Sequence, residues 1–298
     1  MTDIRDRPHL GHGDIAELNF IRSESPFVFR RHFRNGMRSQ IMEVLRPGDV
    51  QRETTGMTGD GVRWFPKAEP RFMLRLFRRR FSSLDQALEE IRRLRIIEAY
   101  LAPDQLARSS EFIVAYRHGG RYDPLLCGLQ VYAPGQALDP WQLLTPAQMA
   151  RWFESAQAPG DGGIDAERFA HRFCINAGRF VDGVRRMISE AGFIPDLAGT
   201  RNMVVTRDGN IRLVDINNVS RIDFGDAIPV DDKGYPVCDK SVEALLRIEG
   251  MLPDRSTHAD DPLVRHFLDP SRMKAVAVLD RQFHRRLAGS PAGEFGRF

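Results

Sequence analysis

The chain has 298 residues, of which 42% are hydrophobic and 28% charged, and its net charge is +3. These values are typical of a soluble globular protein whose core is large enough to fold without disulfides. No apolar run approaches the roughly 20 residues of a transmembrane helix, and the first residues lack the apolar core of a signal peptide. We therefore expect a cytoplasmic protein. The three widely spaced cysteines, Cys127, Cys174 and Cys238, predict buried thiols in preference to a redox or metal role.

The first part of the chain predicts a flexible arm followed by a lobe rich in strands. Residues 1–25 show no sustained periodicity, so we expect a flexible N-terminal arm. Between residues 26 and 133, one helix opens with the capping-box pair Ser83 and Gln86. Short apolar segments bounded by turn residues predict strands at 27–29, 41–45, 72–77, 112–116 and 125–132. The glycine-rich segment 54–65 has two interpretations, a loop that covers phosphates or an ordinary hairpin loop.

Beyond the turn signal Pro134-Gly135 the pattern changes from strands to helices. Apolar residues at helical spacing predict helices at 146–157, 165–190, 240–249 and 271–287. The expected fold class is α+β, with a β-rich lobe at 26–133 and a helical lobe at 134–298. The helical lobe also carries a β-hairpin.

That hairpin is the most informative stretch of the sequence. Two apolar runs, 203–205 and 211–214, flank Arg207-Asp208-Gly209-Asn210, and an Asp-Gly turn between such runs is a strong hairpin signal. Pairing of the two strands brings Asn202, at the start of the first, close to Asp215, at the end of the second. An amide oxygen and a carboxylate together form a hard-oxygen site that suits magnesium. Asp196, shortly before the hairpin, is a third candidate for metal or acid/base chemistry.

This order of elements, with these residues at the hairpin, resembles the protein-kinase-like superfamily, which includes small-molecule and lipopolysaccharide kinases. In that family a catalytic aspartate precedes a metal-binding asparagine by five residues, and a hairpin leads to a second metal-binding aspartate. The interval here is six residues from Asp196 to Asn202 and thirteen from Asn202 to Asp215. The literal Asp223-Phe224-Gly225 lies too far after the hairpin to be the family's metal motif. Asn217 and Asn218 either add a ligand or shape the turn.

The resemblance also implies a bilobal fold and a nucleotide site with further residues. Val131 and Ala133 stand in the hinge segment, whose backbone would hold adenine. Arg75 occupies the position of the usual strand lysine, and its implied helix partner is Glu90 or Glu89. Arginine and lysine present different donor geometries, so this replacement is not neutral. The alternatives are a solvated strand residue for Arg75 and surface ion pairs for the two glutamates.

Three functions follow from this interpretation. The first is an ATP- and Mg²⁺-dependent phosphotransferase acting on a hydroxyl of a small molecule, sugar or glycolipid, with Asp196 as the catalytic residue. The second is a pseudokinase, a nucleotide-binding regulatory scaffold, which the missing strand lysine favours. The third is an ATP-grasp-type ligase. The basic stretches 29–38 and 75–81 predict either peripheral contact with anionic lipid or a solvated surface, and we expect no stable nucleic-acid partner.

Overall fold

The structure is a computed structural model that describes residues 2–22, 25–33, 38–142, 145–156, 165–253, 255 and 258–289. The described chain divides into two compact units, one of residues 2–91 and 108–132 and the other of residues 92–107 and 133–289. The division after residue 132 lies one residue from the expected lobe boundary. Residues 92–107 join the second unit because Leu213 donates a backbone hydrogen bond to Gln105 (2.9 Å) and accepts one from Ala107 (3.0 Å). Together the two units confirm the expected α+β class.

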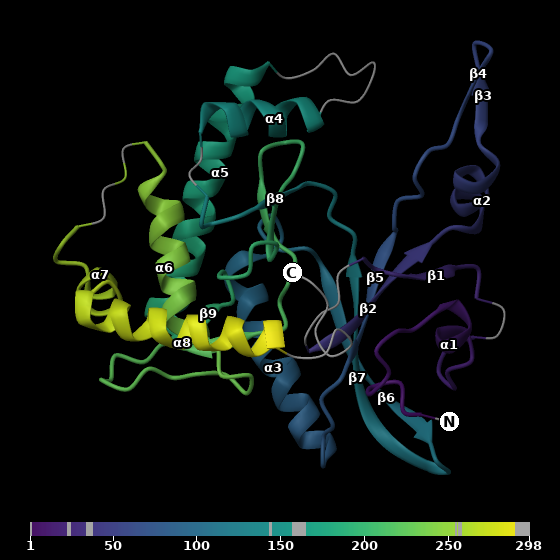
Figure 1. Cartoon of the computed structure of the whole chain (residues 1–298), viewed down its shortest axis with the longest axis horizontal. Helices are drawn as coiled ribbons and strands as arrows, with labels where there is room; N and C mark the ends of the chain where they lie inside the picture. The colour runs from purple at the N-terminus through teal and green to yellow at the C-terminus, as the bar shows by residue number, and fades with distance from the viewer. Residues whose placement is uncertain are drawn as a thin grey trace. The chain divides into compact units, whose positions relative to one another are not determined.

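The first unit is built on a five-stranded antiparallel sheet (Figure 1). In spatial order its strands are β1 (Val28–Arg31), β2 (Ser39–Leu45), β5 (Phe72–Phe77), β7 (Arg121–Val131) and β6 (Ser109–His118). Each overlaps one of the five segments predicted as strands. Apolar side chains from all five strands, among them Phe29, Met42 and Leu125, share one buried cluster. Burial of this shared apolar face stabilises the sheet.

The N-terminal segment, which we expected to be a flexible arm, packs on this unit instead. Ile4, Leu10, Ile15 and Leu18 are buried in the same cluster as the strand side chains. Ile15 lies on a short helix, α1 (His12–Ala16), which lies beside β1 (Figure 1). The intervals between the buried residues fit neither a helix nor a strand, so periodicity could not reveal that the segment is part of the core.

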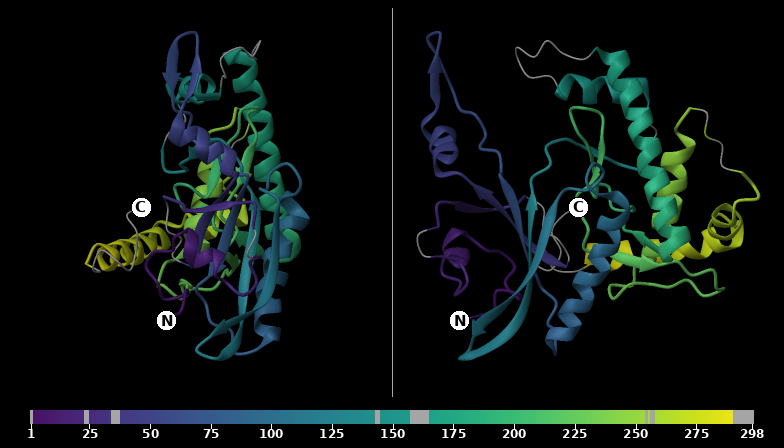
Figure 2. Two further views of the ribbon diagram at one scale, coloured as in Figure 1. Left: turned by 90° about the vertical axis from the view of Figure 1, so that its right-hand side faces the viewer. Right: turned by 180° about the vertical axis from the view of Figure 1, so that it is seen from behind.

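The glycine-rich segment forms an ordinary hairpin. A helix, α2 (Pro47–Thr55), leads into β3 (Met57–Gly59), which pairs with β4 (Val62–Trp64). Asp60 and Gly61 both adopt positive φ, 50° and 76°, as a two-residue hairpin turn requires. All six strand residues are exposed, and the hairpin projects away from the five-stranded sheet (Figures 1 and 2).

The second unit contains most of the helices. Its helices are α4 (Pro146–Ala156), α5 (Ala166–Arg186), α6 (Val237–Gly250), α7 (Pro262–Phe267) and α8 (Pro270–Gly289), joined by the C-terminal part of α3 (Leu84–Leu101). The side chain of Asp165 caps α5 by accepting from the Arg168 amide, which satisfies an otherwise unpaired donor. The predicted apolar face of α5 is buried, and α5 lies beside α6 in both views of Figure 2. One π-helical turn, Met187–Ala191, continues α5 and ends at Gly192.

Two small sheets in this unit carry the hairpin and the strand before it. β10 (Met203–Val205) pairs antiparallel with β11 (Ile211–Leu213) on one side and with β8 (Gln136–Leu138) on the other. β9 (Phe193–Pro195) pairs with β12 (Val219–Arg221). The hairpin is therefore confirmed, with Met203 opposite Leu213. Its Gly209 adopts a φ of 76°, in the left-handed region that the turn needs.

None of the helices in the described part of the chain combines the length and apolarity that crossing a bilayer requires. The three cysteines form no disulfide; Cys127 and Cys238 are buried and Cys174 is half-buried. Burial raises the pKa of Cys238 to about 12 and raises that of Cys127 further. Both thiols stay protonated near neutral pH, which agrees with a packing role.

Gly135, two residues after the predicted hinge residue Ala133, tests the packing of β8 on the hairpin. A Cβ atom at this position would lie 2.5 Å from the Val205 carbonyl oxygen, which is backbone and cannot turn away. We expect Gly135→Ala to destabilise the protein by about 1–3 kcal/mol through overpacking, measured by urea denaturation. Gly250→Ala is the matched control, since a Cβ there meets nothing within 4 Å. Equal stability of the two variants would contradict this packing.

Candidate active site at the mouth of the hairpin

Asn202 and Asp215 meet at the open end of the β10–β11 hairpin. The Asn202 carbonyl accepts hydrogen bonds from the amides of Val214 (2.8 Å) and Asp215 (3.3 Å), which extends the strand ladder by one step. Both side chains are half-buried. The backbones of the two residues therefore meet at one mouth of the hairpin, as the sequence predicts.

Asp196 belongs to the same cluster. The Asn202 side-chain amide donates to the Asp196 carbonyl oxygen (2.9 Å). This hydrogen bond joins the two ends of the loop between β9 and β10. The Asp196 carboxylate accepts from the Ala198 amide (3.0 Å) and from Asn218 Nδ2 (3.4 Å). These two hydrogen bonds fix the orientation of the Asp196 carboxylate.

Asn217 and Asn218 join the two aspartates. The Asn218 carbonyl accepts from the Asp196 amide (3.0 Å), and the Asn217 amide donates to Asp215 Oδ1 (3.1 Å). Of the two alternatives for this pair, the contacts support turn shaping. Their backbone links the chain after Asp215 to the loop that carries Asp196, so the spacing of the two carboxylates is held by hydrogen bonds.

The donor set fits magnesium by its chemistry. Asp196, Asn202 and Asp215 supply carboxylate and amide oxygens, the hard ligands that magnesium prefers. The described residues contain no group of three or more histidine, cysteine, aspartate or glutamate side chains arranged to hold a metal. An ion here would be held by the Asp215 carboxylate and the Asn202 amide oxygen, together with other oxygens such as water or phosphate.

Asp223 and Tyr235 have different surroundings, since the first is exposed and the second is half-buried. Asp223, from the literal Asp-Phe-Gly, is exposed, and its carboxylate accepts from the Gly225 amide (2.8 Å). Burial, followed by the negative charges of Asp280 and Asp196, raises the pKa of Tyr235 well above its ordinary value. The Tyr235 phenol therefore stays neutral.

Arg75 lies in the first unit and is buried in the sheet. Its guanidinium donates from Nη2 to Ser109 Oγ (2.8 Å) and Glu111 Oε1 (2.7 Å), and the Arg75 and Glu111 side chains are each 2% exposed. The register explains the contact, because Gly128 on β7 stands between Arg75 on β5 and Glu111 on β6. A Cβ on Gly128 would lie 3.1 Å from Arg75 Nη2. The missing side chain makes room for an ion pair across three strands.

The other predicted nucleotide contacts have the following surroundings. Glu90 pairs with Arg79 (3.1 Å), and the Arg79 side chain is 59% exposed, as in the surface-pair alternative. The Val131 amide donates to the Arg108 carbonyl (2.8 Å), so this N–H already has a backbone partner. Ala133 follows β7 and is half-buried. Binding of a nucleotide by Arg75, Glu90, Val131 and Ala133 stays a prediction.

Sequence patterns did not identify the residues that hold the Asp196 loop. Ser241 on α6 is fully buried, and its hydroxyl accepts from the Leu197 amide (3.2 Å). Gly199 lies under the Asn202 side chain, with the position of an added Cβ only 2.4 Å from Asn202 Oδ1. A single serine on a helix face carries no distinctive signal. Gly199 does carry a signal, since a glycine between Asp196 and Asn202 indicates a turn or a close approach of the chain.

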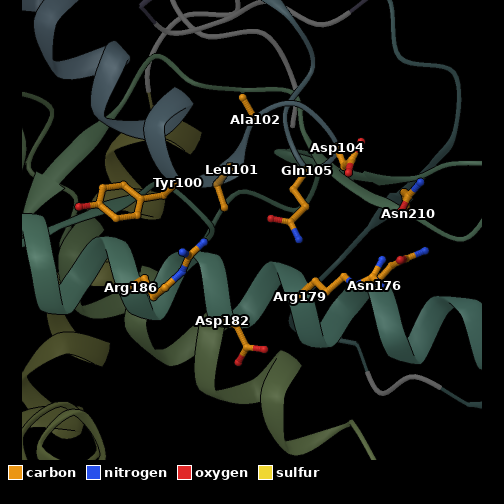
Figure 3. Close-up of a pocket in the computed structure, with 10 residues that line it drawn as sticks. All are labelled: Tyr100, Leu101, Ala102, Asp104, Gln105, Asn176, Arg179, Asp182, Arg186 and Asn210. Atoms are coloured by element: carbon orange, nitrogen blue, oxygen red, sulfur yellow. The ribbon is translucent and has the colours of Figure 1, made fainter.

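A separate pocket of about 300 Å³ lies at the other end of the hairpin, near the turn residue Asn210 (Figure 3). One wall is the α5 face that carries Arg179, Asp182 and Arg186, and the opposite wall is the chain from Tyr100 to Gln105 (Figure 3). The Asp182 carboxylate is held by Arg255 (2.7 and 2.8 Å). None of Asp196, Asn202 and Asp215 lines this pocket.

Comparisons with known proteins identify no family for this chain. No protein-family model matches the chain, and no curated protein matches it. Among solved structures, the chain is similar to the ROP18 kinase domain in complex with AMP-PNP and sucrose. The two are 11% identical, the alignment covers 89% of this chain and 83% of that one, and the TM-score is 0.36. Because this similarity is remote, the chain's own contacts carry the functional interpretation.

Gly199→Ala tests the role of this glycine in placing Asn202. The new methyl group would overlap Asn202 Oδ1, so the asparagine side chain must move and its bond to Asp196 must break. We expect magnesium affinity to fall by about tenfold, since Asn202, one of the two expected protein ligands, is displaced. Isothermal titration with Mg²⁺ measures the change, and Gly250→Ala is the control. Unchanged affinity in Gly199→Ala would show that Asn202 does not bind the ion.

Arg75→Met tests whether Arg75 stabilises the sheet. The substitution leaves the Glu111 carboxylate buried without its cation, and breaking such a pair costs about 3–5 kcal/mol. The double variant Arg75→Met, Glu111→Met should be more stable than Arg75→Met, because it removes both charges. Urea denaturation of the three proteins measures both effects. A single variant as stable as the parent protein would contradict the buried pair.

Proposed function

We propose that the chain is an ATP- and Mg²⁺-dependent phosphotransferase that acts on a hydroxyl group. The observation that carries the proposal is the convergence of Asp196, Asn202 and Asp215 through direct hydrogen bonds between their backbone and side-chain groups. A bound magnesium ion would supply charge neutralisation for nucleotide phosphates.

In this proposal Asn202 and Asp215 hold the ion, and Asp196 orients the acceptor hydroxyl and takes up its proton. Hydrogen bonds from Ala198 and Asn218 hold the Asp196 carboxylate in one orientation. The acceptor loses its proton as its oxygen bonds to the terminal phosphorus, and the bond from that phosphorus to the bridging oxygen of ADP breaks. Rate acceleration comes mainly from positioning and electrostatics, as is general for phosphoryl transfer.

The acceptor class follows from what lies after the site. Between β12, which ends at Arg221, and α6, which begins at Val237, the described chain forms no helix or strand. This short connection offers no extended surface on which a protein substrate could lie. We therefore propose a small molecule, sugar or glycolipid as the acceptor.

A pseudokinase scaffold is the second candidate. Arg75 occupies the position of the usual nucleotide-binding lysine. The observation in favour of a scaffold is that the Arg75 guanidinium donates hydrogen bonds to Ser109 and Glu111. Thermal shift with ATP, with and without Mg²⁺, followed by an ADP-release assay separates the two candidates. Binding without ADP release would support the scaffold. The ATP-grasp alternative does not fit the five helices α4 to α8 in the unit that carries the hairpin.

Asp215→Asn tests the metal role while it preserves size and the bond from the Asn217 amide. We expect magnesium-dependent ADP release to fall by at least about 100-fold, because the ion loses an anionic ligand. Asp223→Asn is the matched control, since it makes the same change at an exposed aspartate that also accepts an amide hydrogen bond. Full activity in Asp215→Asn would rule out the assignment.

Asp196→Asn separates proton transfer from metal binding. Loss of a general base lowers turnover by roughly 10²–10⁴-fold, whereas Mg²⁺ affinity measured by titration should change much less than in Asp215→Asn. The pH dependence of turnover provides a second readout, because the limb that reports ionisation of the base should disappear. Retention of that limb in the variant would assign the titration to another group.

A further inference from the structure

Trp141 contacts the loop that carries Asp196. Its indole Nε1–H donates to the Ala198 carbonyl oxygen at 2.8 Å, two residues after Asp196. The Ala198 amide in turn donates to the Asp196 carboxylate (3.0 Å). Ala198 thus accepts a hydrogen bond from Trp141 through its carbonyl oxygen and donates one to Asp196 through its amide.

The tryptophan is itself held on two sides. Its backbone amide donates to Asp139 Oδ1 (3.0 Å), which fixes the turn that follows β8, and β8 pairs with β10 of the hairpin. Lys240 Nζ lies 3.9 Å from the centre of the indole ring, within the range of a cation–π contact. The indole therefore lies between the hairpin sheet and α6.

The two cations that contact the Trp141 ring, Lys240 and Arg247, both pair with Glu243. Lys240 Nζ pairs with Glu243 Oε2 (2.7 Å), and Arg247 Nε pairs with Glu243 Oε1 (3.1 Å). The Arg247 guanidinium carbon also lies 5.4 Å from the centre of the Trp141 ring. Lys240 and Glu243 are each 15% exposed, so solvent screens this contact less than it would screen a surface pair.

We infer that Trp141 is a positioning residue for the Asp196 loop, linking the hairpin sheet and α6 to the backbone next to the carboxylate. This inference rests on the proposed function, since positioning becomes catalytic only if Asp196 acts on an acceptor. The residue touches neither ion nor acceptor in this proposal. It acts by limiting the orientations of the peptide between Asp196 and Asn202, and small misplacements of a reacting group are costly.

Trp141→Phe removes the N–H donor and keeps an aromatic ring for Lys240. We expect kcat to fall by about tenfold, corresponding to the loss of one hydrogen bond that orients a catalytic group. The KM for ATP should stay within about twofold, because nucleotide contacts are unchanged. Trp152→Phe is the matched control, since Trp152 is buried on α4 with its ring 5.6 Å from that of Phe173, so the same change perturbs packing away from the loop.

Amide hydrogen exchange of residues 197–202, measured without nucleotide, gives a readout that does not depend on catalysis. Trp141→Phe should increase exchange in this segment several-fold while exchange in β10 stays as in the parent protein, and Trp152→Phe should leave the segment unchanged. If the parent protein shows no phosphotransfer but Trp141→Phe loosens the loop, positioning stands and the proposed function fails. If Trp141→Phe exchanges like the parent or retains full kcat in an active protein, the inference is overturned.

Discussion

The antiparallel pairing of β10 with β11 is the constraint on which the candidate site depends. Each strand has only three residues, and the pairing of Met203 with Leu213 places Asn202 one residue before the ladder on β10 and Asp215 two residues after it on β11. Side chains alternate between the faces of a strand, so a slip by one residue would reverse the hairpin's faces. The Asp-Gly turn and the pairing of β8 with β10 together oppose that slip. Two catalytic candidates thus derive their positions from one short ladder.

The loop before the hairpin is ordered mainly through its backbone. Leu197 is held by Ser241, Ala198 by Trp141, and the Asp196 amide by the Asn218 carbonyl. These partners come from α6, from the turn after β8 and from the chain after Asp215, which are far apart in sequence. Contacts from several elements restrict a loop more than contacts within it, because each tether is supported by a separately packed element. An ordered loop reduces the reorganisation that a reaction at Asp196 would require.

The buried Arg75–Glu111 pair bears on the choice between enzyme and scaffold. Removing two charges from water costs free energy, and here the cost is offset by the ion pair and by the Ser109 hydroxyl. With these partners, the Arg75 guanidinium stabilises the five-stranded sheet. The sequence has only four lysines, Lys67, Lys233, Lys240 and Lys274, and Lys240 is already paired with Glu243. An active enzyme of this kind would rely strongly on its metal ion to neutralise phosphate charge.

By itself the sequence determined the strongly periodic elements and the hairpin. The strand at 72–77 and the long helices were predicted because apolar spacing and capping residues act locally, and the Asp-Gly turn fixed the meeting of Asn202 and Asp215. Only the tertiary structure decided the packing of residues 2–22 on the sheet, since their buried side chains follow no period. It also decided the partner of Arg75 and the supports of Asp196, because strand order and helix packing bring together residues that are distant in the chain. Local patterns carry no information about such neighbours.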